Sequence, residues 1–344
     1  MFVTNKFKNY WTDFTVLLKV VDLSEKTCLI TGANSGIGLE MTRSLSARGC
    51  TVLMACRNKY AAGQVARAVA DCAQPPTITP TFYELNLASL RSVTDCSHHI
   101  LKHVKKIDIV ILNAAVFGLP WTLTEDLLET TFQVNYLSQL YLLSKLESIL
   151  APDARVVFVS SESHRNVKWT VEDQLMPTEG MVSLPCDQYT SIKAYNISKL
   201  CCLLAMHHIA YRWMKTTKSV FSAHPGSFVK TRLCRNWWPY EVLYTVMLPF
   251  SKTVSQAAST PLYCATSPNL DGLSGYYYKN FERCDESDIA KDFHLSFRMY
   301  DLYRELLTER LSALDDNITK DRIVSPTPEP KEPVHDTLAP EYSA

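Results

Sequence analysis

Short apolar runs with the character of buried strands alternate along this chain with stretches that have the periodicity of amphipathic helices. Strands that are covered on both faces appear as near-continuous apolar runs, so the pattern predicts a parallel sheet with helices on both faces. Right-handed crossovers then give a single doubly wound α/β domain, a Rossmann-type fold, whose ligand crevice lies beyond the carboxyl ends of the strands. The predicted strands are 27–30, 52–55, 82–85, 107–112, 156–160 and 220–223.

The composition sets the size of this domain and excludes one class of partner. The chain has 344 residues, of which 47% are hydrophobic, and its 35 Lys and Arg residues balance its 35 Asp and Glu residues. A large apolar core is therefore possible, and we expect no basic surface of the kind that binds nucleic acid. We expect the folded domain to span residues 22–314.

The two ends of the chain differ in character from this domain. Residues 1–21 contain neither a signal-peptide cleavage pattern nor an apolar run long enough to span a membrane, so we expect an N-terminal extension that docks on the domain or lies on a membrane surface. Residues 315–344 are rich in proline and charge, which predicts a disordered tail. The 11 cysteines have no paired spacing, which suits a reducing compartment. We expect a cytoplasmic protein, and association with an organelle membrane surface stays open.

A glycine-rich segment, T-G-A-N-S-G-I-G at residues 31–38, follows the first predicted strand and opens a helix. In this position Gly32 permits a tight turn, Gly36 permits close approach of a ligand, and Gly38 permits packing of the helix against the strand. The helix amino terminus offers its N–H groups and the positive end of its dipole to a pyrophosphate. The segment therefore predicts a dinucleotide site. The predicted site also includes Thr31, Asn34, Ser35 and Ile37.

The second predicted strand is followed by Arg57, with Lys59 as a further candidate, at the place where an NAD(H)-specific site carries an acidic ligand for the ribose. A guanidinium suits a 2′-phosphate instead, and no Asp or Glu competes at this strand end. The sequence therefore favours NADP(H) over NAD(H) as the cofactor.

Tyr195 and Lys199 lie four residues apart on a predicted helix, so their side chains share one face. A cation within reach of a phenol favours the phenolate and lowers the tyrosine pKa. Such a tyrosine can exchange a proton with a carbonyl or an alcohol. The pair follows the strand-like run V-V-F-V-S-S, which ends at Ser161. We interpret these residues as a catalytic site at the carboxyl edge of the sheet.

Together these motifs resemble the short-chain dehydrogenase/reductase family over residues 22–280. The motifs are T-G-x-x-x-G-x-G at 31–38, N-A-A at 113–115, Q-V-N-Y around Asn135, S-S-E-S-H at 160–164, Y-N-I-S-K at 195–199 and H-P-G at 224–226. Within the family, the runs at 118–124, 128–135 and 236–238 are most similar to the branch of the WW domain-containing oxidoreductases, with the retinol dehydrogenases as near relatives. No WW repeat precedes residue 22, so we expect no binding of proline motifs through such modules.

The resemblance implies an oxidoreductase that acts on CH–OH groups, with roles assigned by position. Tyr195 would be the general acid and base, Ser161 would hydrogen-bond the substrate oxygen, and Lys199 would also bind the nicotinamide ribose. Asn135 would hold a water in the proton relay. Further cofactor contacts are implied for Asn86, Leu87, Asn113, Ala114, Pro225 and Gly226, and Ser227 or Thr231 would grip the carboxamide. Asn86 departs from the family, which usually has an aspartate for the adenine, but an amide can still accept one bond.

The substrate side is marked by apolar segments near the predicted site. An insertion between Ser161 and Tyr195 contains Trp169, Met176, Met181 and Tyr189, and an aromatic run follows H-P-G. These favour a lipophilic, steroid- or retinoid-like substrate, while a lid packed on its own domain or a peripheral membrane face are the alternatives. We assign His164 and His224 to structure. A second function also stays open, a cofactor-binding regulatory or tumour-suppressor-like signalling protein with little turnover, and a homodimer is compatible with either.

Overall fold

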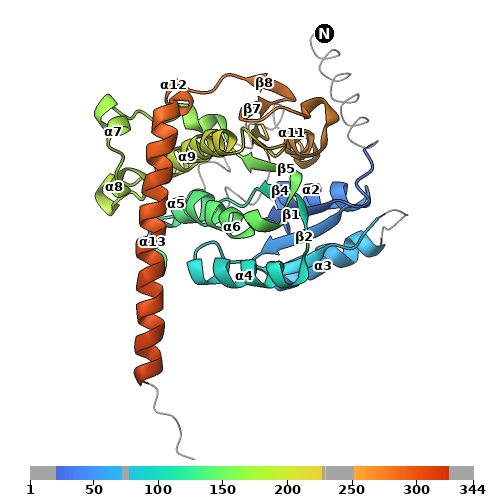
Figure 1. The fold of residues 1–344 in the computed structure, drawn as a ribbon, viewed down its shortest axis with the longest axis horizontal. Coiled ribbons are helices and arrows are strands. Elements are labelled where there is room, and N and C mark those ends of the chain that lie inside the picture. The colour runs from blue at the N-terminus through green and yellow to red at the C-terminus, as the bar shows by residue number, and fades with distance from the viewer. Residues whose placement is uncertain (1–20, 72–76, 227–228, 230–251, 325–344) are drawn as a thin grey trace, which may run out of the picture.

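The computed structural model describes residues 21–71, 77–226, 229 and 252–324. Their centre is one eight-stranded sheet with the order β3-β2-β1-β4-β5-β6-β7-β8 (Figure 1). All neighbouring strands pair in parallel except β7 and β8, which are antiparallel. The predicted doubly wound α/β domain is therefore confirmed. The strands are β1 (Thr27–Thr31), β2 (Thr51–Cys56), β3 (Thr81–Glu84), β4 (Ile107–Leu112), β5 (Leu150–Val159), β6 (Ser219–His224), β7 (Tyr276–Lys279) and β8 (Glu282–Cys284).

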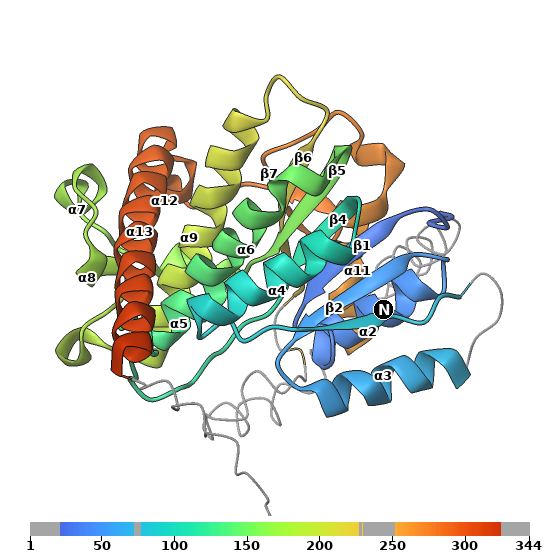
Figure 2. The same ribbon diagram turned by 60° about the horizontal axis from the view of Figure 1, so that its bottom comes forward.

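Helices cover both faces of this sheet. One face packs against α4 (Leu90–His103), α6 (Ser138–Leu146) and α9 (Ser191–Arg212), which lie side by side in Figure 2. The other packs against α2 (Gly36–Ser46), α3 (Lys59–Asp71) and α11 (Val254–Thr266). Successive strand residues alternate between these two cores, as Leu29 and Ile30 of β1 do, because side chains alternate across a strand. Burial on both faces explains the continuous apolar runs of the sequence.

Each predicted strand overlaps an observed one, although the observed bounds differ in places. β5 begins at Leu150, well before the predicted start at residue 156, and includes the polar residues Asp153 and Arg155. β7 and β8 were not predicted. They form a hairpin around Asn280 and Phe281, whose φ angles of 53° and 67° are the left-handed values that a tight antiparallel turn requires.

Short elements connect these layers. They are α5 (Thr130–Phe132), η1 (Gln133–Leu137), η2 (Glu147–Ile149), η3 (Glu162–Asn166), α7 (Val171–Leu175), α8 (Glu179–Val182), η4 (Cys186–Gln188), η7 (Pro268–Leu270) and α12 (Asp288–Lys291). α7 and α8 form an excursion from the body of the domain, beside the last helix (Figure 1). This excursion corresponds to the insertion between Ser161 and Tyr195.

The last helix, α13 (Phe293–Val324), lies across α9 (Figure 1). Its buried side chains, such as Leu295, Met299 and Tyr303, join the core that α9 shares. The helix continues to Val324, which corrects the predicted start of the tail at residue 315. Nothing in residues 315–324 interrupts a helix, and the first proline beyond them is Pro326.

Two other predictions about the ends of the chain meet the limits of the described residues. The expected N-terminal extension falls almost entirely within residues 1–20, outside the described part, as does the tail from residue 325. Among the helices that the structure describes, none combines the length and the apolar character needed to cross a bilayer.

Candidate active site

The glycine-rich turn after β1 has little room for side chains. Gly32 has a φ of +66°, and a Cβ built on Gly38 would lie 2.2 Å from the carbonyl oxygen of Gly32. Ser35 precedes α2 in an extended conformation, and its side chain makes no capping bond. The first N–H groups of this 11-residue helix can therefore serve an anion, as predicted for a pyrophosphate.

A group of buried hydrogen bonds joins the ends of β1 and β4 beneath this turn. The hydroxyl of Thr31 donates to Oε1 of Gln139 (2.7 Å) and accepts from the backbone N–H groups of Asn113 (2.9 Å) and Ala114 (3.0 Å). Nδ2 of Asn113 donates to the carbonyl oxygen of Thr31 (2.9 Å). Thr31 and Asn113, predicted as cofactor contacts, thus hold two strand ends together. Sequence reasoning missed Gln139, whose only signal was a glutamine in an otherwise apolar helical run.

Above the turn lies a cleft of about 550 Å³ at the carboxyl edge of the sheet. Its charged lining residues are Arg57 and Lys199, and no carboxylate of the described chain lines it. The predicted residues that line it are Gly32, Asn34, Ser35, Gly36, Ile37, Arg57, Asn86, Leu87, Asn113, Ala114, Tyr195, Lys199 and Pro225. The predicted residues that do not line it are Thr31, Gly38, Asn135, Ser161 and Gly226. A cationic cleft with these backbone donors suits an anionic dinucleotide.

Two polar residues line the cleft beyond the ends of β2 and β3. Arg57 directly follows β2 and is exposed. Asn86 follows β3, and its Oδ1 accepts from the backbone N–H of Ala88 at 3.3 Å. The side-chain oxygen of Asn86 therefore stabilises the turn that follows β3, as a carboxylate oxygen of an aspartate could, and Asn86 also lines the cleft.

Lys199 and Tyr195 share one face of α9, as predicted. Lys199 is buried, its Nζ donates to the carbonyl oxygen of Val159 (2.8 Å), and it lies 5.5 Å from the centre of the Tyr195 ring. Burial lowers the pKa of Lys199, while Cys202 acts to raise it. The ring of Tyr195 packs edge-on against Phe117, with 5.0 Å between the centroids. The amine of Lys199 is thus fixed beside the ring of Tyr195 at the cleft wall.

Asn135 lies in η1, a π-helical turn of the kind often found at functional sites. Its side chain is fully buried, with Oδ1 accepting from the N–H of Val116 at 2.7 Å. Nδ2 donates to the carbonyl oxygen of Val116 (3.0 Å) and to Oγ of Ser198 (3.1 Å). Ser198 in turn donates to the carbonyl oxygen of Tyr195 (2.8 Å). Both amide hydrogens are therefore committed to protein partners, while Oδ1 keeps a second lone pair that can accept from the predicted water.

The two serines after β5 have different surroundings. Ser160 is buried, lines the cleft, and donates to the carbonyl oxygen of Lys199 at 3.3 Å. Ser161 is partly exposed and caps η3, where its Oγ accepts from the N–H of Ser163 at 3.2 Å. That bond uses a lone pair of Ser161, so its hydroxyl hydrogen can be donated to a ligand.

The segment after β6 closes one side of the site. His224 is buried, and burial lowers its pKa to about 4, so it is neutral near pH 7. Gly226 has a φ of +112°, and the side chain of Lys252 packs directly against it. Ser227 and Thr231, the candidates for a carboxamide contact, lie outside the described residues.

The apolar residues of the insertion that was expected near the cleft lie in different surroundings. The hydroxyl of Tyr189 donates to the carbonyl oxygen of Leu119 (2.9 Å), which lines the cleft, and Trp169 packs against the core. Met176 is 74% exposed on the α7 excursion. The aromatic run at 237–250 lies outside the described residues. Tyr189 is thus the member of this set that the structure connects to the cleft wall.

Comparison with known proteins agrees with this architecture. A family model described as short chain dehydrogenase matches residues 26–170. A WW domain-containing oxidoreductase of Drosophila melanogaster is 42% identical over 288 residues, 84% of this chain and 70% of that protein. Retinol dehydrogenase 12 of Mus musculus is 34% identical, over 83% of this chain and 88% of its own length. A solved structure of an uncharacterized protein from Mycobacterium paratuberculosis is 25% identical with a TM-score of 0.66, covering 84% of this chain and 96% of that one.

Proposed function

Because the chain belongs to the short-chain dehydrogenase/reductase family, we propose that it is an NADP(H)-dependent oxidoreductase that interconverts an alcohol and a carbonyl. The observation that carries the proposal is the pairing of Tyr195 with Lys199, whose buried ammonium is held by the carbonyl oxygen of Val159. A buried cation 5.5 Å from the ring centre is costly to keep unless it acts on a partner. At the wall of a ligand-sized cleft, that partner is the phenol.

The residues present fit a nicotinamide dinucleotide. The Gly32–Gly38 contact leaves no space for a Cβ, the amino terminus of α2 offers N–H groups, and Arg57 supplies a cation for a 2′-phosphate. When bound, the cofactor supplies or accepts the hydride. We assign the pyrophosphate to the segment 32–37 and the adenosine to the surroundings of Arg57 and Asn86.

The residues of the chain then divide the remaining work of the reaction. Tyr195 donates its proton to a carbonyl oxygen, or accepts one from an alcohol, and the ammonium of Lys199 stabilises the phenolate. Ser161 donates its hydroxyl hydrogen to the same substrate oxygen. Asn135 acts indirectly, because its amide fixes Val116 and the turn of α9 that carries Tyr195.

For the substrate class, we propose a lipophilic alcohol or carbonyl. Val116, Leu119 and Val134 line the cleft together with Tyr195, and Phe117 packs on the tyrosine ring. Apolar surroundings with a few polar groups at the reacting atoms are typical of sites for small apolar ligands. The likeness to retinol dehydrogenase 12 supports the same class.

The decisive test compares two variants for turnover and for cofactor affinity. Tyr195→Phe should reduce kcat by about 10²- to 10⁴-fold and leave the NADPH affinity nearly unchanged, because only the proton donor is lost. Lys199→Ala should weaken NADPH binding as well. The measurements are NADPH oxidation with a panel of lipophilic aldehydes and ketones, and a binding titration for each variant.

A tyrosine on the same helix provides the control. Tyr211 is 47% exposed on α9, so Tyr211→Phe should leave both quantities unchanged. Full turnover in Tyr195→Phe would remove this residue from its role. Tight NADPH binding by the native protein, with no turnover on any substrate, would favour the alternative of a cofactor-binding signalling protein.

A further inference from the structure

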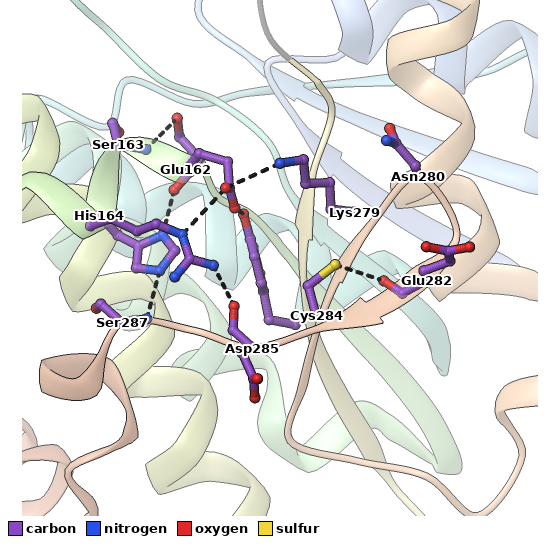
Figure 3. A network of polar contacts seen from close by, with 12 residues as sticks. Glu162, Ser163, His164, Lys279, Asn280, Glu282, Cys284, Asp285 and Ser287 are labelled. Carbon is purple, nitrogen blue, oxygen red and sulfur yellow. Dashed lines mark hydrogen bonds and ion pairs between the residues drawn. The ribbon is translucent and has the colours of Figure 1, made fainter. Parts of the chain in front are cut away.

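His164 lies in the segment that follows Ser161 and is hydrogen-bonded to Ser287, which lies 123 residues later in the chain (Figure 3). Its Nε2 accepts from the backbone N–H of Ser287 at 3.2 Å, and its Nδ1 lies 2.7 Å from the carbonyl oxygen of Ser161. A backbone amide can only donate, so Nε2 must carry the lone pair. The neutral ring then has its hydrogen on Nδ1 and donates it to Ser161. The two bonds together select one tautomer and one ring orientation.

The surroundings of His164 keep this ring neutral. The side chain is fully buried, and burial lowers its pKa against the effect of its bond to Ser161. Of the charged groups around it, Arg165 also lowers the pKa, whereas Glu162 and Glu286 raise it. An imidazolium would direct an N–H at the N–H of Ser287 and break the link. Both ring nitrogens of His164 are engaged by backbone groups, so the ring has no free nitrogen with which to act on substrate.

Ser287 belongs to residues 285–287, which follow β8 and which we call the brace. Two further contacts hold the brace in place. Arg165 donates to the carbonyl oxygen of Asp285. Glu286 is buried and pairs with Nε2 of His207 on α9 at 2.5 Å. Since α9 also carries Tyr195, the brace contacts the serine segment and the tyrosine helix at once.

Glu162, the residue after Ser161, is separately fixed to β7. The carboxylate of Glu162 accepts from the hydroxyl of Tyr277 (2.6 Å) and from Nζ of Lys279 (3.1 Å). Burial opposes ionisation of Glu162, but these hydrogen bonds lower its pKa to about 2. Figure 3 shows Glu162, Lys279 and His164 arranged around this turn. The backbone that follows Ser161 is therefore fixed from two sides.

We propose that His164 is a positioning residue for Ser161, a role that rests on the proposed function of that serine. Ser161 has an extended backbone, and its carbonyl oxygen accepts from the ring of His164 and, at 3.3 Å, from the backbone N–H of the same residue. The shorter ring bond fixes the peptide plane after Ser161, and through it the direction of the serine side chain. The brace sets the position of the ring relative to α9.

Two substitutions separate the two bonds of the ring. His164→Asn can place an amide N–H where Nδ1 stands, so it keeps the bond to Ser161 and loses the bond to Ser287. His164→Gln reaches the position of Nε2, so it keeps an acceptor for Ser287 and loses the donor to Ser161. We expect a fall in kcat of about 10- to 100-fold for Gln and only a few-fold for Asn, because a displaced catalytic group costs rate steeply. The affinity for NADPH should change in neither.

Two readouts decide the proposal. The first is kcat and KM for a lipophilic aldehyde with NADPH. The second is a crystal structure of each variant: the side chain of Ser161 should be displaced in the His164→Gln variant and unchanged in the His164→Asn variant. Equal losses of kcat in both variants, or an unmoved Ser161 in the Gln variant, would overturn the proposal. The structures decide even if the native protein turns nothing over, and that failure, seen in the native protein alone, would count against the proposed function instead.

Discussion

At the scale of single residues, the charge at the end of β2 decides which cofactor fits. Arg57 is an exposed cation on the cleft wall, and no described carboxylate shares that wall. We expect the native protein to bind NADPH more tightly than NADH, and Arg57→Asp to reverse the order. A charge-assisted bond to the 2′-phosphate contributes about 1.5–3 kcal/mol, roughly 10- to 100-fold in affinity. Calorimetric titration with both cofactors measures it.

A neighbouring lysine serves as the control for this change. Lys59 begins α3, is also exposed, and does not line the cleft. Lys59→Asp introduces the same change of charge two residues away and should leave the preference for NADPH intact. Equal native affinities for the two cofactors would contradict the assignment of Arg57.

Replacing glycine by alanine should have opposite effects on stability at two positions, Gly38 and Gly63. In Gly38→Ala the new Cβ would lie 2.2 Å from the carbonyl oxygen of Gly32 and 2.7 Å from Nδ2 of Asn113, so the turn must shift. We expect loss of measurable NADPH binding and a lower melting temperature. Gly63→Ala in α3 meets nothing within 4 Å and should stabilise the protein by about 0.5–1 kcal/mol. Thermal melts and cofactor titrations of both variants check this, and normal NADPH binding by Gly38→Ala would disprove it.

At the scale of elements, the sequence predicts what is determined locally. The central strands were predictable because burial on both faces leaves a run of apolar residues. β7 and β8 were not, since both strands are short. β7 depends on pairing with β6, which only the tertiary fold supplies, and β8 pairs with β7. The predicted tail begins at residue 315, inside α13, because the polar residues there suggest a tail although they permit a helix.

The candidate site divides in the same way. The glycine turn, the Tyr195–Lys199 pair and most cleft residues were placed from motifs, because each motif has a local geometry. The Thr31–Gln139 bond and the commitment of the Asn135 amide were not predictable, since each joins segments that meet only in the folded sheet. Motif reasoning therefore predicted which residues the fold brings together, but not which protein partners their polar atoms take.

The helix α13 gives a prediction at this scale. Its first half buries Leu295, Met299, Leu302, Tyr303 and Leu306 in the core shared with α9, whereas the sequence from residue 315 to 324 is mostly polar or charged. We expect a chain ending at residue 314 to keep its melting temperature and its NADPH affinity. A chain ending at residue 292 loses several buried side chains, each contributing about 1.5–3 kcal/mol, and should not fold. Circular dichroism melts distinguish them, and a drop of several degrees in the longer chain would show that residues beyond 314 contribute.

At the scale of the whole molecule, two histidines buried in different parts of the fold act together on stability. His208 lies between α9 and α13, stacked on Tyr300 at 3.8 Å, and His224 ends β6. Burial lowers the pKa of each to about 4, and for His208 the nearby Arg212 lowers it further while Asp301 opposes. Both rings are therefore neutral in the folded protein at pH values where an unfolded chain would be protonated.

The sign of the pH dependence follows from this difference. Between about pH 6.5 and pH 4 the unfolded chain binds protons that the folded protein does not, so stability is full above pH 6.5 and falls as the pH decreases. At pH 5 the loss should be on the order of 2 kcal/mol per histidine. His208→Phe keeps the ring on Tyr300 without a proton site and should remove the contribution of this histidine, about 2 kcal/mol at pH 5. The measurement is the free energy of unfolding in urea at pH 7.5 and pH 5, with His98→Ala on the exposed side of α4 as the control that should behave as native. An equal free energy at the two pH values would contradict the prediction, because it would mean that these rings take up protons without leaving the folded core.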